Sequence, residues 1–138
     1  YLVPTFAAMF VSQTEPKARA FWLARLTPML ESCAAAIEKA YRAGEKIGFG
    51  TDSAPMSKQY EQGVEFQYRK DYCHMENIDI LLQATKYSAE IAGISGRVGE
   101  IKSSLQADLV LVDGNPAEDL SVMYKRPKKV WKKGKMVV

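Results

Sequence analysis

The segment KIGFGTDSAP, residues 46–55, decides how the chain is interpreted. Its first part, residues 46–51, has the composition of a short buried strand, which ends at Asp52 before Pro55 breaks it. In parallel α/β folds, functional side chains gather where strands end and loops converge. The Asp52 carboxylate can therefore bind a metal ion, accept a proton, or simply satisfy backbone amides in a turn.

The residues before this segment predict a strand, a helix and a return to the second strand. Residues 1–6 are apolar enough for a buried strand, despite Pro4. The helix that follows should be interrupted where Thr27 can cap and Pro28 can occupy a first helical position. Gly44 then ends the helix. Two strands connected in this way pair in parallel.

The residues after the segment predict two helices and then a small β region. A polar loop leads to a helix at 64–71, and a stronger helix at about 76–92 ends at Gly93. A turn and short strand follow at residues 96–101, and a longer strand at 107–113. A hairpin at 130–138 turns around Lys133 and Gly134. The character of the chain therefore changes near residue 94, within one compact body.

Composition limits the class of protein. The chain has 138 residues, of which 47% are hydrophobic and 25% charged, as expected for one ordinary folded domain. No apolar run approaches the roughly 20 residues that span a bilayer, and the first residues lack the pattern of a signal peptide. We therefore expect no membrane partner and a cytoplasmic protein. Because Tyr1 begins in the middle of a strand, we also expect sequence to be missing upstream.

Two cysteines and one histidine leave little room for a metal site of their own. Cys33 and Cys73 can form one disulfide in an oxidising compartment, or they can be buried free thiols, which we favour. Cys73, His74 and Glu76 lie close in sequence. However, adjacent ligands do not have the spacing of a structural zinc site, and no second Cys/His pair exists.

The run KRPKKVWKKGK, residues 125–135, holds seven basic residues and no acidic ones. The rest of the chain has 12 basic and 16 acidic residues, a balance of −4. A basic run with a tryptophan is typical of nucleic-acid binding, through phosphate contacts and stacking. The same residues suit a β-hairpin whose lysines keep an exposed edge from pairing. We expect the hairpin and no nucleic-acid partner.

Five motifs, taken together and in order, resemble the carboxyl-terminal part of the amidohydrolase superfamily. The most similar branch contains imidazolonepropionase-like enzymes and metal-dependent Xaa-Pro dipeptidases. The motifs are GFGTDS, LLQATKYSAEIAG, GRVGEI, ADLVLVDGNPAEDL and VWKKGK, at residues 48–53, 81–93, 96–101, 107–120 and 130–135. The resemblance covers nearly the whole chain.

This resemblance implies an α/β fold that is only part of a larger one. Residues 1–93 would be the C-terminal portion of a (β/α)8 TIM barrel, with strand 7 at residues 1–6 and strand 8 at 46–51, together with their helices. Residues 94–138 would be the C-terminal half of a small composite β-sandwich, built jointly from sequence before and after the barrel.

The resemblance also implies a role for Asp52. It would contact a divalent metal, commonly zinc, in a site of one or two ions, and would act as proton shuttle. A bound metal lowers the pKa of its water toward ~7. A carboxylate beside it can take the proton as the water attacks a carbonyl, and then give it to the leaving nitrogen. Thr51 and Ser53 would support Asp52 by hydrogen bonds or line the substrate loop.

The departures from the family pattern are informative. A His-x-His pair, a Lys or acid, and two further histidines come from earlier strands in the family, and none is present here. Either the chain is a fragment of a longer enzyme, or the other part of that enzyme is a separate chain. The implied partner is the missing N-terminal part of the same enzyme, and the chain alone should be inactive and bind no metal tightly. The family usually has glycine at Ser104 and leucine at Gln106, which affects turn geometry or packing.

The expected function is hydrolysis of a C–N bond, in a dipeptide or a small cyclic amide, by a homo-oligomeric enzyme. Two alternatives stay open. The chain can be a basic nucleic-acid-binding module that uses residues 125–135, or a noncatalytic interaction domain in which Asp52 only caps a turn.

Overall fold

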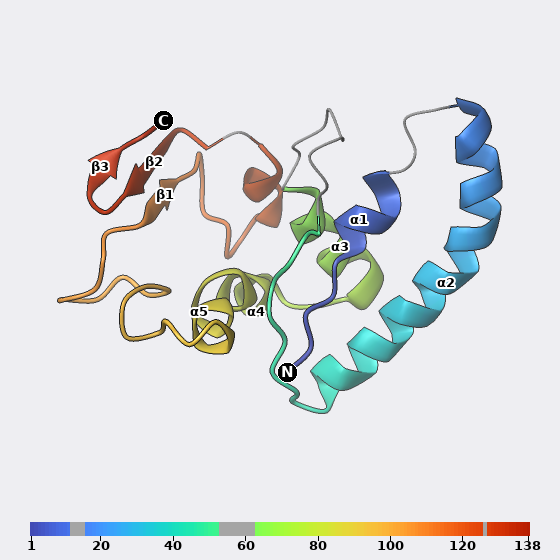
Figure 1. The fold of residues 1–138 in the computed structure, drawn as a ribbon, viewed down its shortest axis with the longest axis horizontal. Coiled ribbons are helices and arrows are strands. Elements are labelled where there is room, and N and C mark those ends of the chain that lie inside the picture. Colours follow the sequence, from blue (N-terminus) through green and yellow to red (C-terminus); the bar gives the residue numbers. More distant parts are fainter. Residues whose placement is uncertain (12–15, 53–62, 126) are drawn as a thin grey trace.

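A computed structural model describes residues 1–11, 16–52, 63–125 and 127–138. Figure 1 shows a long helix at one end of the molecule, shorter helices in the middle and a small sheet at the other end. The predicted polar loop after Asp52, which includes Ser53, lies outside the described residues. Across the part of the chain that is described, no helix is long and apolar enough to cross a membrane.

Two helices follow the first extended segment. Helix α1 spans Phe6–Val11, and α2 spans Pro16–Arg42. Helix α2 continues through Pro28, so the predicted interruption at Thr27 is wrong. A proline inside a helix removes one backbone hydrogen bond, to the carbonyl four residues earlier. Here Ala24 and Pro28 are both exposed, so water can bind the freed carbonyl.

The two predicted strands are reduced to extended segments, residues 1–5 and 46–51, which run side by side in the middle of the molecule (Figure 1). The predicted parallel pairing is confirmed, but only as a single bridge between Leu2 and Ile47. The Leu2 amide donates to the Lys46 carbonyl (3.3 Å), and the Gly48 amide donates to the Leu2 carbonyl (2.8 Å). The prediction that both segments form regular strands is therefore wrong. The first segment also ends earlier than predicted, because α1 begins at Phe6.

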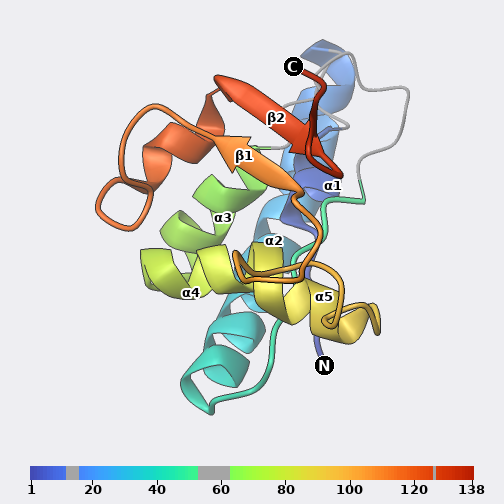
Figure 2. The same cartoon turned by 90° about the vertical axis from the view of Figure 1, so that its left-hand side faces the viewer.

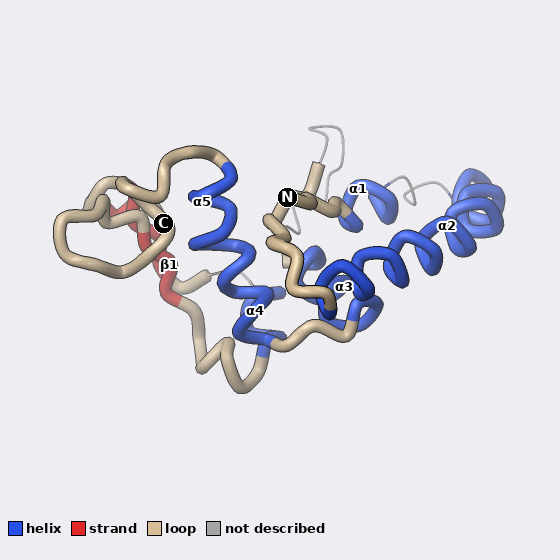
Figure 3. The backbone as a smooth tube through the Cα atoms, turned by 90° about the horizontal axis from the view of Figure 1, so that it is seen from below, coloured by secondary structure: helices blue, strands red, loops and turns tan. Residues whose placement is uncertain are grey.

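The middle of the molecule is helical, as predicted. Helix α3 spans Val64–Cys73, and a second helical rod contains α4 (Asn77–Leu82), the π-helical turn η1 (Gln83–Tyr87) and α5 (Ser88–Ile91). Figure 3 shows α4 and α5 in line with each other. The predicted helix at 76–92 is thus confirmed, with one wider turn inside it. Gly93 ends it with a left-handed φ of 70°.

The small sheet is antiparallel and has the order β1 (Leu109–Leu111), β2 (Lys129–Lys132) and β3 (Lys135–Met136). Figure 2 shows β1 and β2 side by side. The predicted hairpin is confirmed, and its turn at Lys133 and Gly134 has φ values of 53° and 75°, as a type I′ turn requires. Residues 96–97 form a turn and 98–100 a bend, so the turn predicted there is confirmed and the short strand is wrong.

One apolar core joins the two halves of the sequence. Its buried members from the region before residue 94 come from α1, α2, α3, α4 and the segments between helices: Phe6, Leu30, Ala34, Ile47, Phe66, Cys73, Met75 and Ile80. Leu120, from the 3₁₀ helix η2 (Leu120–Tyr124), belongs to the same cluster. The region after residue 94 therefore packs directly on the region before it. The division at residue 94 itself stays a prediction.

Candidate functional site

Asp52 lies just beyond the carboxyl end of the second extended segment, as predicted. Its side chain is exposed, and its backbone has a left-handed φ of 46°. Aspartate is one of the few residues besides glycine that visit this conformation. Thr51, beside it, is half-buried. The position fits a functional carboxylate at the end of a strand, and its role as ligand or shuttle stays a prediction.

The residues that hold the Asp52 segment form a buried polar network that sequence analysis missed. Glu65 and Arg69 lie one turn apart on α3, and neither side chain is exposed to solvent. Arg69 Nε donates to Glu65 Oε1 (2.9 Å), and Glu65 Oε2 accepts the amide N–H of Ala7 (2.8 Å). The pair therefore links α3 to the first turn of α1.

The Arg69 guanidinium contacts both extended segments. Its Nη1 donates to the Gly48 carbonyl (2.9 Å) and to Gln83 Oε1 (2.7 Å), and its Nη2 donates to the Pro4 carbonyl (2.7 Å). Its carbon Cζ lies 4.5 Å from the centre of the Phe49 ring. Four of its N–H donors thus have named acceptors, which a buried guanidinium needs.

Burial controls the electrostatics of this network. It raises the pKa of Glu65 to about 7, although Arg69 and the amides of Ala7 and Phe6 act in the opposite direction. Burial also lowers the pKa of Arg69, while Glu65 opposes the shift. An arginine stays protonated at neutral pH even so. Glu65 therefore depends on Arg69 and the two amides to carry a charge inside the protein.

The sequence carried a weak signal of this network. Glu65 and Arg69 are spaced i and i+4 within the predicted helix at 64–71, which is the spacing of a helical ion pair. Such pairs usually lie on exposed helix faces, where they contribute little. Nothing local in the sequence indicates that this one is buried, because its acceptors come from Pro4 and Gly48, far along the chain.

The residues described here do not form a metal site on their own. Among them, no three His, Cys, Asp or Glu side chains come together to hold an ion. Asp52 is a single carboxylate, whereas a stable site needs three or four ligands. It can therefore contribute one ligand to a site completed by other residues, which is what the resemblance implies.

The Cys73 and His74 pair does not add a site. Both cysteines are free, as favoured from the sequence, but only Cys73 is buried and Cys33 is half-buried. Cys73 is buried, and burial raises the pKa of its thiol to about 12, so the thiol is protonated at neutral pH. His74 instead faces Glu38, with 3.2 Å between Nδ1 and Oε2.

The basic run is partly neutralised by its own neighbours. Lys132 of β2 pairs with Asp108, and Lys128, directly before β2, pairs with Asp113 at 2.8 Å. The lysines therefore have structural roles beside the sheet. The absence of a nucleic-acid partner stays a prediction.

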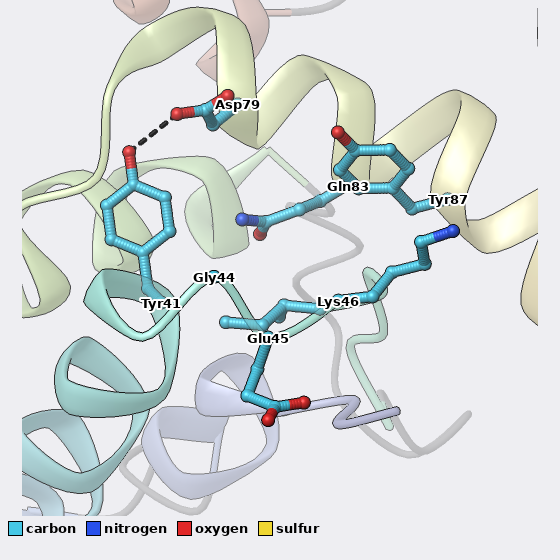
Figure 4. Close-up of a pocket in the computed structure, with 8 residues that line it drawn as sticks. Tyr41, Gly44, Glu45, Lys46, Asp79, Gln83 and Tyr87 are labelled. Carbon is cyan, nitrogen blue, oxygen red and sulfur yellow. Dashed lines mark hydrogen bonds between the residues drawn. The ribbon is translucent and has the colours of Figure 1, made fainter.

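A cavity of about 210 Å³ lies at the other end of the second segment (Figure 4). It is lined by the amino end of that segment, including Lys46, and by residues of α2, α4 and η1. Across it, the Tyr41 hydroxyl donates to Asp79 Oδ2 (2.6 Å). Because Asp52 follows the carboxyl end of the segment, this cavity is not the predicted site.

Comparison with known proteins identifies the family. The amidohydrolase family model matches residues 11–137, almost the whole chain. The chain belongs to the amidohydrolase family. The resemblance found in the sequence is thus confirmed, and the family's structures imply a TIM-barrel superfamily. Members of this superfamily generally use divalent metals.

Three relatives show which kinds of protein within the family this chain is similar to. Ochratoxinase of Aspergillus niger is 29% identical over 117 residues, which are 82% of this chain and 24% of that protein. A prolidase complexed with N-methylphosphonate-L-proline is 30% identical with a TM-score of 0.77, over 99% of this chain and 34% of the other. A Xaa-Pro dipeptidase with bound methionine is 32% identical with a TM-score of 0.75, over 96% of this chain and 32% of the other. The chain thus spans about a quarter to a third of these relatives.

Proposed function

We propose that this chain is the C-terminal portion of a metal-dependent amidohydrolase that cleaves a C–N bond, in a dipeptide or a small cyclic amide. The family match over residues 11–137 carries the proposal. The relatives named prolidase, Xaa-Pro dipeptidase and ochratoxinase favour amide-like substrates. The rest of the active site would come from the other two thirds of the same protein.

In this proposal the two extended segments are the last two strands of the barrel. Residues 1–5 and 46–51 run in parallel, as neighbouring barrel strands do. Asp52 then lies at the carboxyl end of the last strand, which is the face where TIM-barrel enzymes place their catalytic groups. The small antiparallel sheet would be the C-terminal half of a sandwich completed by earlier sequence.

Asp52 would have two tasks in this site. As a carboxylate it would hold a divalent metal, zinc in our proposal, which when bound supplies a water of low pKa. It would also keep the proton released from that water and pass it to the leaving nitrogen. The exposure of Asp52 in this chain leaves its oxygens accessible for both tasks. Thr51 and Ser53 would orient it.

The test uses the full-length protein that contains this chain, assayed with a panel of Xaa-Pro dipeptides and N-acyl amino acids. Asp52→Asn keeps the size of the side chain but cannot carry a proton. It should lower kcat by roughly 10³-fold. The matched control is Asp71→Asn, at an exposed aspartate of α3, which should stay within about twofold of the wild type.

Two results would contradict the proposal. One is a near-normal kcat in Asp52→Asn with metal bound, which would remove the shuttle role. The other is a full-length protein that hydrolyses no member of the panel, with and without added zinc, manganese or cobalt. That result would favour a noncatalytic interaction domain in which Asp52 caps a turn.

A further inference from the structure

The parallel pairing between the two extended segments stops at Pro4. Its two bonds use the amides of Leu2 and Gly48. In a parallel ladder of this register, the next two bonds would run from the amide of residue 4 to the Gly48 carbonyl, and from the amide of Gly50 to the Pro4 carbonyl. Proline has no N–H, so the first of these bonds cannot form.

The Arg69 side chain donates to the same two carbonyls. Nη1 lies 2.9 Å from the Gly48 oxygen and Nη2 lies 2.7 Å from the Pro4 oxygen. The two donors therefore join the segments at the point where the backbone ladder ends. A guanidinium can do this because its donors have a fixed, planar arrangement.

We propose that Arg69 is a side-chain rung that replaces the ladder bonds interrupted at Pro4, and that it positions the segment leading to Asp52. This catalytic consequence rests on the proposed function, whereas the rung itself does not. Asp52 follows Gly48 by four residues, so the separation of the segments at Gly48 sets where its carboxylate lies. Arg69 is a positioning residue and does not contact the reacting atoms.

The surroundings of Arg69 keep the rung fixed. Glu65 Oε1 holds Nε (2.9 Å), Gln83 Oε1 holds Nη1 (2.7 Å), and the Phe49 ring lies 4.5 Å from Cζ. Because Glu65 also accepts the Ala7 amide, the same pair fixes the point at which the first segment turns into α1. The rung thus determines where each of the two segments continues into the next part of the chain.

The first experiment replaces the planar guanidinium by an ammonium in the full-length protein. Arg69→Lys keeps the positive charge but lacks the two terminal nitrogens that each reach one carbonyl, so kcat should fall roughly 10²-fold, as expected for a misplaced catalytic group, while KM changes less than about threefold. Arg42→Lys is the matched control. Arg42 also pairs with a glutamate one turn away but is exposed, so its kcat should stay within about twofold.

A rescue separates the rung from a general loss of packing. Pro4→Ala restores an amide N–H at the position where the ladder is interrupted. In the Arg69→Lys background it should recover part of the lost kcat, on the order of tenfold, because a backbone bond can again reach the Gly48 carbonyl. Equal losses in the single and the double variant would overturn the proposal.

Amide hydrogen exchange gives a reading that does not depend on activity. In Arg69→Lys, exchange of the peptide covering residues 46–52 should be at least about tenfold faster than in the wild type and in Arg42→Lys, and Pro4→Ala should slow it again. Unchanged exchange would overturn the rung. Faster exchange in a protein that hydrolyses nothing would uphold the rung and refute the proposed function.

A milder variant covers the case in which Arg69→Lys does not fold. Gln83→Leu removes the acceptor that holds Nη1 but leaves the guanidinium in place. As in Arg69→Lys, kcat should fall and amide exchange of residues 46–52 should become faster, each by several-fold. If neither changes in a folded Gln83→Leu protein, the proposal is wrong.

Discussion

A fully buried ion pair is the feature at the residue scale that matters most for this chain. Glu65 and Arg69 have no exposed side-chain surface. Their attraction is offset by the cost of removing both charges from water, so the pair is not expected to add much net stability. Removing one partner is different, because the other is then buried without compensation.

We predict that Arg69→Met destabilises the full-length protein by about 3–5 kcal/mol. The double variant Glu65→Gln/Arg69→Met should recover a large part of this loss, since a neutral amide can still accept the Ala7 N–H without an uncompensated charge. Chemical denaturation of both proteins measures the difference. Arg42→Met, at an exposed pair, is the control and should stay within about 0.5 kcal/mol. A double variant no more stable than Arg69→Met would contradict the charge argument.

At this scale the sequence predicted Asp52 and missed Arg69 for physical reasons. Asp52 follows a short apolar run directly, so local pattern is enough to single it out. Arg69 acts on carbonyls more than 20 residues away along the chain, and only the fold brings them together. The i,i+4 spacing with Glu65 was visible, but its burial was not.

At the scale of elements, the contact between α3 and η2 joins the two halves of the sequence. It depends on Gly63, immediately before α3. A Cβ atom there would lie 2.5 Å from the Met123 carbonyl oxygen and 2.6 Å from the Tyr124 Cα, both backbone atoms. Backbone cannot rotate away as a side chain can, so the two elements would have to separate.

We therefore predict that Gly63→Ala destabilises the protein by about 1–3 kcal/mol, as overpacking does. Gly96→Ala is the matched control, because a Cβ at Gly96 meets nothing within 4 Å and its φ is not in the left-handed region. That change should be neutral or slightly stabilising. Thermal unfolding of the two variants side by side measures the effect. Equal stability of the two variants would contradict this prediction, because it would show that η2 can move away from the added Cβ atom at little cost.

The hairpin has a pH-dependent anchor in Asp108. Its carboxylate accepts from Lys132 Nζ, from the Lys133 amide (2.8 Å) and from Gln106 Nε2 (2.9 Å). Gln106, where the family usually has leucine, thus helps to hold this anchor. The pair with Lys132, followed by these other bonds, lowers the pKa of Asp108 from 3.8 to about 2.

This shift fixes the direction of the pH dependence. Since the pKa is lower in the folded state, the contribution of Asp108 is fully present above about pH 4 and is lost as pH falls through about 2. Asp108→Asn should therefore melt below the wild type at pH 5, and the gap between their melting temperatures should close by about pH 2. A gap that stays constant over this range would contradict the anchor. Asp71→Asn controls for a general change in charge.

Helices could be predicted from this sequence better than strands. The helices at 64–71 and 76–92 carry their own periodic pattern and stop signals, so α3 and the rod that ends at Gly93 form as expected. The segments at 1–5 and 46–51 need neighbours on both edges to become strands, and Pro4 removes a ladder donor between them. Their composition predicted where they lie and how they pair, but not how short the pairing is.

At the scale of the whole molecule, the first extended segment leaves apolar side chains exposed to solvent. Tyr1 is 75% exposed, Leu2 40% and Val3 48%. In the sheet and directly after it, Val110, Leu111 and Val137 are about half exposed as well. A parallel pair with one bridge is far from the covered sheets in which parallel strands are normally found. The relatives, three to four times as long, have ample chain to cover such surfaces.

We therefore predict that the isolated 138-residue chain self-associates, through its extended segments and the exposed face of the small sheet. Unpaired strand edges and apolar side chains favour pairing with another copy. The chain should also bind no zinc tightly, because Asp52 offers one carboxylate where three or four ligands are needed. Size-exclusion chromatography with light scattering, run beside metal analysis, tests both points, with the full-length protein as control. A monomer that melts cooperatively and holds one equivalent of zinc would refute the view that the site is completed elsewhere.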